Sequence, residues 1–186
     1  MAKLYFYYGT MASSKTANLL ITCYNYEKLN KKVILCQPAI NNRDGENIIK
    51  SRIGLQRNCI SLEEFILNKD HLDYDVVIVD EAQFASSKQI DELSNEVDFN
   101  NKDVICYGLK TDFKCKFFDG SKRLFEIADC IREIKTLCWC GKKAIFNARI
   151  VNNVLVKDGH QIELGLDDKY VPLCRKHYKE GKLCLK

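Results

Sequence analysis

The chain has 186 residues, enough for one full hydrophobic core or for one core with a small appended module, and too few for a larger multidomain machine. Hydrophobic residues make up 46% and charged residues 29%, as in a globular protein, and no stretch approaches the roughly 20 apolar residues that cross a bilayer. The net charge of +4 is too small to indicate nucleic-acid binding, so we expect neither a nucleic-acid nor a membrane partner.

The predicted elements alternate between short β-rich runs and amphipathic runs. In chain order we expect a strand at 3–8, a helix at 15–29, a strand at 31–36, helices at 46–52 and 61–67, a strand at 75–80, a helix at 86–97, a strand at 103–109 and a helix at 121–128. This alternation predicts an α/β fold with a mainly parallel sheet and helices on both faces. We assign it to a nucleotide-binding domain of residues 1–135.

From residue 136 to 186 the pattern changes to clustered Cys and His, a "KDG" turn and short alternating runs that are typical of hairpins. We expect a small, metal-stapled module there. The first residues, "MAKLYFYYGT", lack the longer apolar region and cleavage site of a signal peptide, which predicts a cytoplasmic protein with reduced cysteines.

A phosphate-binding loop is predicted at residues 9–16, "GTMASSKT", because it follows a strand and precedes a helix. The candidate phosphate ligands are Gly9, Thr10, Met11, Ala12, Ser13, Ser14, Lys15 and Thr16. Backbone N–H groups would converge on phosphate oxygens, Lys15 would reach the β and γ phosphates, and the Thr16 hydroxyl would serve Mg²⁺. Ser14 replaces the motif's glycine, which costs roughly 1–2 kcal/mol if that position needs a positive φ. The alternative is an ordinary turn with Ser13 or Ser14 capping the helix.

A second motif, "DVVIVDEAQF", is an apolar strand that ends in Asp80 and Glu81. Nucleotide-binding α/β proteins place a magnesium-linked carboxylate at such a strand end. Asp80 would position the ion, and Glu81 would take a proton from a nucleophile. Because that nucleophile is either water or a substrate hydroxyl, an ATPase and a small-molecule kinase both remain open. The alternative is a strand end with solvated acids.

Cys138 and Cys140, with Cys174 and His177 further along the chain, supply the four ligands of a structural zinc site. The C-x-x-H spacing is favourable, whereas C-x-C is tighter than the usual C-x-x-C. The alternative is a group of buried free thiols.

Seven segments occur in the order found in one known family: "YYGTMASSKTANLL", "QPAINNR", "SRIGL", "VIVDEAQF", "CYGLKTDFKCKFFDGSKRL", "EIKTLCWCGKKAIFNARI" and "KYVPLCRKHY". By these segments the chain resembles, from about residue 3 to 178, the thymidine kinases of the cellular, tetrameric type found in many bacteria, animals and poxviruses. The resemblance implies a P-loop (RecA-like) α/β domain. It also implies transfer of the γ-phosphate of ATP to the 5′-hydroxyl of thymidine, giving dTMP for DNA-precursor salvage, with Glu81 as general base.

Further roles follow from the same resemblance. Lys15 would grip the phosphates, Thr16 and Asp80 would hold Mg²⁺, and Gln83 and Arg43 would lie at the ATP phosphates. The implied thymidine contacts are Met11, Phe84, Leu109, Phe113, Phe118, Arg149, Gly165 and Tyr170. A loop at about 147–172 would fold over the base as a lasso, stapled by structural Zn²⁺. A homotetramer and dTTP as a feedback ligand are also implied.

The chain departs from the family pattern at Ser14, Asn41 and Asn42. These departures motivate one alternative, an impaired or altered nucleotide-binding protein or ATPase of the same fold. A nucleic-acid-stimulated ATPase is a second alternative because "DEAQ" is similar to helicase motifs. Against it, the chain has neither the length for a second ATP-clasping domain nor a basic, aromatic stripe.

Overall fold

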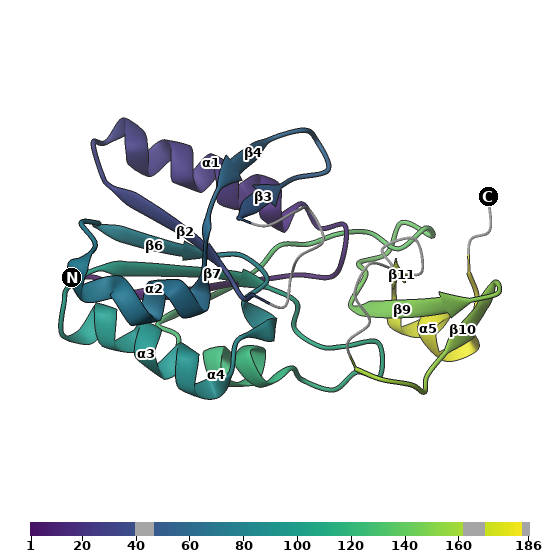
Figure 1. Ribbon diagram of the computed structural model, residues 1–186. Helices are drawn as coiled ribbons and strands as arrows, with labels where there is room; N and C mark the ends of the chain where they lie inside the picture. Colours follow the sequence, from purple (N-terminus) through teal and green to yellow (C-terminus); the bar gives the residue numbers. More distant parts are fainter. Residues whose placement is uncertain (40–46, 162–169, 184–186) are drawn as a thin grey trace.

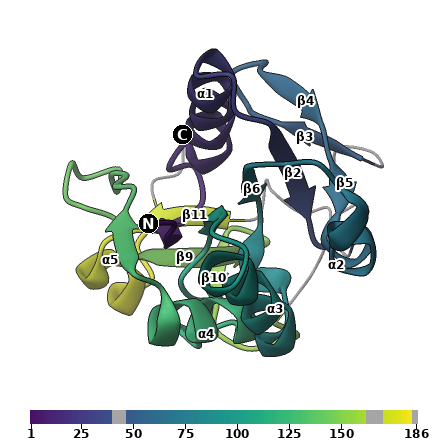
Figure 2. The same cartoon turned by 90° about the vertical axis from the view of Figure 1, so that its left-hand side faces the viewer.

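The computed structural model describes residues 1–39, 47–161 and 170–183, shown from two sides in Figures 1 and 2. The predictions for Asn41, Asn42, Arg43 and Gly165 lie outside these residues. The main sheet has six strands in the order β5-β2-β6-β7-β1-β8, and every pairing is parallel. Its strands are β1 (Leu4–Tyr8), β2 (Val33–Gln37), β5 (Ile60–Ser61), β6 (Val76–Val79), β7 (Asp103–Gly108) and β8 (Cys130–Glu133). The predicted parallel sheet is thus confirmed.

Helices cover both faces of this sheet (Figures 1 and 2). One face carries α1 (Lys15–Lys28), and the other carries α2 (Leu62–Asn68), α3 (Ser87–Asp98) and α4 (Asp119–Ile127). Two single turns of 3₁₀ helix, η1 (Lys69–His71) and η2 (Ala82–Phe84), follow α2 and β6. Among the described residues, none of these helices is long and apolar enough to cross a bilayer.

The period-2 alternation of β6 divides its four valine and isoleucine side chains between the two helical layers. Val77 and Val79 lie in the core under α2, α3 and α4, whereas Val76 and Ile78 lie in the core under α1. All four are at most 2% exposed. Burial on both faces explains why this strand is an uninterrupted apolar run.

The predicted helix at 46–52 is wrong. Residues Ile48–Lys50 form strand β3, which pairs antiparallel with β4 (Gln56–Asn58). Ile49 is buried at 2% exposure while Lys50 points outward, so the segment follows a strand period rather than a helical one. The Ser51 hydroxyl holds the connecting turn by hydrogen bonds to the backbone of Leu55.

The C-terminal module contains a three-stranded antiparallel sheet in the order β10-β9-β11, formed by β9 (Phe146–Val151), β10 (Val154–Val156) and β11 (Tyr170–Leu173). Asn152 and Asn153 join β9 to β10 with positive φ angles of 49° and 61°, as a tight hairpin turn requires. A short helix not predicted from the sequence, α5 (Arg175–Glu180), follows. Figure 1 shows the module beyond the carboxyl ends of the main strands, where ligands of open α/β sheets bind.

Candidate active site

The predicted phosphate loop connects β1 to α1 at the carboxyl edge of the sheet (Figure 1). Its first residue, Gly9, donates its N–H to the carbonyl oxygen of Gly108 at the end of β7, over 3.2 Å. A Cβ atom on Gly9 would lie 2.5 Å from the carbonyl oxygen of Ile134. The loop therefore begins in a space that only a glycine fills.

Lys15 is the first residue of α1 and is only 8% exposed. Its ammonium group donates to the carbonyl oxygen of Thr10 over 2.8 Å and lies 3.5 Å from Oγ of Ser13. The positive charge is therefore held inside the loop, at a helix N-terminus that already favours anions. This is the arrangement that binding of a polyphosphate needs.

Ser14 adopts the left-handed conformation, with φ 61° and ψ 27°. It is the N-cap residue of α1, but its side chain is exposed and makes no capping hydrogen bond. The alternative of a turn capped by the Ser14 side chain is therefore wrong. The position does require a positive φ, so the serine in place of glycine strains the loop.

The two sequence motifs meet across strand β7, which lies between β1 and β6. The Thr16 hydroxyl, in the first turn of α1, donates to Oδ2 of Asp80 over 2.9 Å. Residues 64 positions apart in sequence thus form one polar centre.

Asp80 is 4% exposed. Burial, and next the neighbouring charge of Glu81, raise the pKa of the Asp80 carboxyl to about 7, although hydrogen bonds from Thr16 and from the Glu81 N–H favour its ionised form. Such a carboxylate is stabilised by a nearby cation. A carboxylate and a hydroxyl are also oxygen donors that suit Mg²⁺, so these residues fit the predicted ion.

Glu81 also adopts a left-handed conformation, with φ 50°, where β6 turns into η2. The side-chain amide of Gln83 donates to the Glu81 carboxylate, and Oε1 of Gln83 accepts the N–H of Leu109 over 2.9 Å. Gln83 is 2% exposed, so it is a fixed support. It orients the candidate general base against the end of β7, next to the Asp80 centre.

Two of the predicted thymidine contacts face each other. The rings of Phe84 and Phe118 lie edge to face, with centroids 5.7 Å apart. Leu109, a third predicted contact, lies at the end of β7, and its carbonyl oxygen accepts the Ser121 hydroxyl over 2.5 Å. These apolar side chains come from two connections at the carboxyl edge of the sheet: Phe84 follows β6, and Leu109 and Phe118 lie between β7 and α4.

A second group of predicted contacts lies where the C-terminal module meets the connection between β7 and α4, which carries Phe113. The guanidinium carbon of Arg149 lies 5.2 Å from the centre of the Phe113 ring, and Phe113 is 1% exposed. Tyr170 on β11 is the register partner of Arg149 on β9. Phe113, Arg149 and Tyr170 are thus brought together, while Gly165 lies outside the described residues.

Asn147 is a site residue that sequence reasoning missed. It is 4% exposed, its Oδ1 accepts the N–H of Met11 over 2.8 Å, and its Nδ2 donates to the carbonyl oxygen of Thr111 over 3.2 Å. One side chain of β9 therefore joins the phosphate loop to the segment that precedes Phe113. A single asparagine in a strand carries no sequence signal for this role.

The four predicted zinc ligands form one cluster, with all ligand atoms within 4.8 Å of one another. Nδ1 of His177 lies 3.4 Å from Sγ of Cys138 and 3.5 Å from Sγ of Cys174, and the Sγ atoms of Cys140 and Cys174 are 3.9 Å apart. Tetrahedral zinc with thiolate and imidazole ligands needs ligand-to-ligand separations of about 3.5–3.8 Å. The donor set therefore fits structural zinc better than the alternative of unrelated thiols.

The helix that carries His177 also contacts the candidate thymidine site. The hydroxyl of Tyr178, the next residue, donates to the carbonyl oxygen of Phe113 over 2.5 Å. A disturbance of the Cys–His cluster would therefore reach Phe113 through α5.

Comparison with known proteins bears on this geometry. A family model described as thymidine kinase matches residues 2–178. A thymidine kinase of Streptococcus pyogenes serotype M3 is 43% identical over 185 residues, covering 96% of this chain and 97% of that protein. One from Haemophilus influenzae is 42% identical over 188 residues, covering 97% of each. A solved structure of the replication initiator DnaA bound to AMPPCP and single-stranded DNA has 19% identity and a TM-score of 0.46, and covers 73% of this chain and 41% of that one.

Proposed function

The chain belongs to the thymidine kinase family, and we propose from that premise that it transfers the γ-phosphoryl group of ATP to the 5′-hydroxyl of thymidine. The hydroxyl oxygen forms a bond to the γ-phosphorus, the bond from that phosphorus to the β,γ-bridging oxygen breaks, and the hydroxyl proton passes to Glu81. The products are dTMP and ADP.

The observation that carries this proposal is the contact of Thr16 with Asp80, which unites the phosphate loop with the acidic strand end. Phosphoryl transfer depends mostly on positioning and charge stabilisation, so loop, cation site and base must share one centre. Lys15 would supply fixed positive charge within the loop, and its hydrogen bond to the Thr10 carbonyl oxygen supports this role. Thr16 and Asp80 would hold Mg²⁺, which neutralises phosphate charge when bound.

Glu81 is the candidate general base because it adjoins this centre and Gln83 fixes its orientation. Two groups of side chains would enclose thymidine. The first group is Phe84, Leu109 and Phe118, and the second group is Phe113, Arg149 and Tyr170. The zinc cluster would staple the base of the module that carries Arg149 and Tyr170. Family membership further leads us to propose a cytoplasmic homotetramer with dTTP as a feedback ligand.

The test is dTMP formation from ATP, Mg²⁺ and thymidine by the native chain and by Glu81→Gln. Loss of a general base lowers rates by about 10²–10⁴-fold, and we expect a fall of that size in kcat. Glu126→Gln, the same change on the exposed surface of α4, is the matched control and should keep native activity. Native-like activity in Glu81→Gln would remove Glu81 from this role.

The same assay separates the alternatives. A rate of ATP hydrolysis that does not change with thymidine but increases when nucleic acid is added would indicate the nucleic-acid-stimulated ATPase. Binding of ATP with no turnover would indicate an impaired nucleotide-binding protein.

A further inference from the structure

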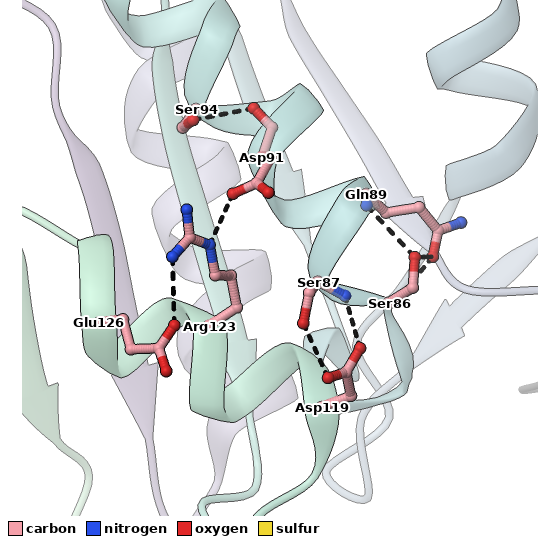
Figure 3. A network of polar contacts seen from close by, with 8 residues as sticks. All are labelled: Ser86, Ser87, Gln89, Asp91, Ser94, Asp119, Arg123 and Glu126. Atoms are coloured by element: carbon pink, nitrogen blue, oxygen red, sulfur yellow. Dashed lines mark hydrogen bonds and ion pairs between the residues drawn. The ribbon is translucent and has the colours of Figure 1, made fainter.

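Figure 3 shows a network of polar contacts between α3 and α4, which cover the face of the sheet opposite α1. At one end, Asp119 uses both carboxylate oxygens on one residue of α3. Its Oδ2 accepts the Ser87 N–H over 2.6 Å, and its Oδ1 accepts the Ser87 hydroxyl over 2.7 Å. Ser86, the preceding residue, forms a capping box with Gln89, so the start of α3 is already ordered.

The Asp119 contact lies close in sequence to both rings of the first thymidine group. Phe84 is three residues before Ser87, and Phe118 immediately precedes Asp119. The two hydrogen bonds therefore close a small ring of chain, from Phe84 through Ser87 and Asp119 to Phe118. The edge-to-face contact of the two aromatic rings completes it.

The residues after Asp119 restrict the start of α4 further. Gly120 packs so closely on the turn after β6 that a Cβ atom would lie 2.6 Å from the carbonyl oxygen of Ala85. Ser121 is bonded to the carbonyl oxygen of Leu109. The beginning of α4 therefore touches each segment that carries a residue of the first thymidine group.

We propose that Asp119 is a positioning residue that, through Ser87, sets the distance between Phe84 and Phe118 and so the affinity for thymidine. This inference rests on the proposed function, because it needs thymidine to bind beside these rings. Asp119 does not contact the reacting atoms. It acts by holding the N-termini of α3 and α4 together.

A carboxylate suits this position for two reasons. Each of its two oxygens accepts one hydrogen bond from Ser87, whereas a side-chain amide in its place would offer only one acceptor oxygen. Hydrogen bonds from the side chain and N–H of Ser87 also lower the pKa of the Asp119 carboxyl, so it stays ionised at neutral pH, at a helix N-terminus that favours negative charge.

The same pair of helices provides a matched control. On α4, Nε of Arg123 lies 2.6 Å from Oδ1 of Asp91 on α3, and Nη1 lies 3.1 Å from Oε2 of Glu126 on the same helix (Figure 3). This contact also ties α3 to α4, but it lies further along both helices than Phe84 and Phe118. Loss of Arg123 loosens the helix pair without releasing the aromatic rings.

The experiment measures thymidine KM, ATP KM, kcat and the unfolding midpoint for the native chain, Asp119→Ala and Arg123→Ala. Loss of two hydrogen bonds predicts a rise of about three- to thirtyfold in thymidine KM for Asp119→Ala, with kcat and ATP KM within about twofold of native. Arg123→Ala should leave all three kinetic constants within about twofold, although its midpoint also falls. Ser87→Ala keeps the hydrogen bond from its backbone N–H to Asp119 and should therefore give a smaller rise in thymidine KM. It replaces Asp119→Ala as the test variant if Asp119→Ala does not fold.

Three outcomes overturn the inference. One is a native thymidine KM in a folded Asp119→Ala variant, or in Ser87→Ala if the former does not fold. A second is an equal rise in Arg123→Ala, which would show general loosening of the helix pair. The third is a native chain that forms no dTMP, which overturns the proposed function as well and so differs from the first two.

Discussion

Replacing Ser14 by glycine should stabilise the fold slightly and leave phosphoryl transfer intact. Ser14 holds φ at 61° with an exposed side chain that makes no capping hydrogen bond. Its carbonyl oxygen accepts the N–H and the side-chain amide of Asn18, both over 3.0 Å, and glycine keeps both bonds. The substitution therefore removes strain and keeps the hydrogen bonds that Ser14 makes to Asn18.

The magnitude follows from two opposing terms. Relief of the left-handed conformation is worth roughly 1–2 kcal/mol. The greater freedom of glycine in the unfolded chain costs roughly 0.5–1 kcal/mol. The net gain is about 0–1.5 kcal/mol, which for a chain of this length raises the unfolding midpoint by up to about 6 °C.

Thermal unfolding and dTMP formation measured on the same preparations give the test. Ala12 is the matched control, because it is also exposed and holds φ at 59° in the same loop. Ala12→Gly should raise the midpoint by a similar amount. A lower midpoint in Ser14→Gly would refute the reasoning, as would a loss of most of the activity, because either would reveal a role for the hydroxyl. Product from Ser14→Gly but none from the native chain would mean that the serine disables the loop.

Two further predictions concern the module and the core. Chelation of zinc should weaken thymidine binding and loosen the C-terminal module before the main sheet unfolds, because α5 carries both His177 and the Tyr178 contact; identical thymidine affinity and unfolding with and without chelator would contradict this. Burial by itself raises the pKa of the Glu96 carboxyl, but hydrogen bonds, including those from Tyr74 and Lys69, lower it overall. Its stabilising effect is therefore present at neutral pH and is lost as pH falls below about 4, so the midpoint difference between native and Glu96→Gln should shrink there rather than stay constant.

The strands were predictable where burial dominates. The run from Val76 to Val79 is apolar because both faces of β6 are covered, and such a run indicates a central parallel strand. The strand within 46–52 was not predictable, because the single apolar pair Ile48 and Ile49 fits the period of a helix as well as that of a strand. Its strand pairing depends on the turn at Ser51, which is a contact and not a pattern.

The same division holds for the candidate site. Lys15, Thr16, Asp80 and Glu81 were predictable because their chemistry requires fixed spacing beside a strand end. Asn147 was not, since its two hydrogen bonds reach backbone groups 136 and 36 residues away. Roles that depend on which loops the fold brings together leave no mark on the local sequence.

The meeting of Gly9 and Gly108 bears on how such a site changes as sequences diverge. The two strand ends are joined through main-chain atoms, and a Cβ atom on Gly108 would lie 2.8 Å from Oε1 of Gln83. Main-chain groups at this contact offer the same hydrogen-bond donors and acceptors whatever side chains surround them. Substitutions among the side chains around the proposed thymidine site can therefore accumulate and alter the fit of the nucleoside. The start of the phosphate loop keeps its shape as long as Gly9 and Gly108 have no side chain.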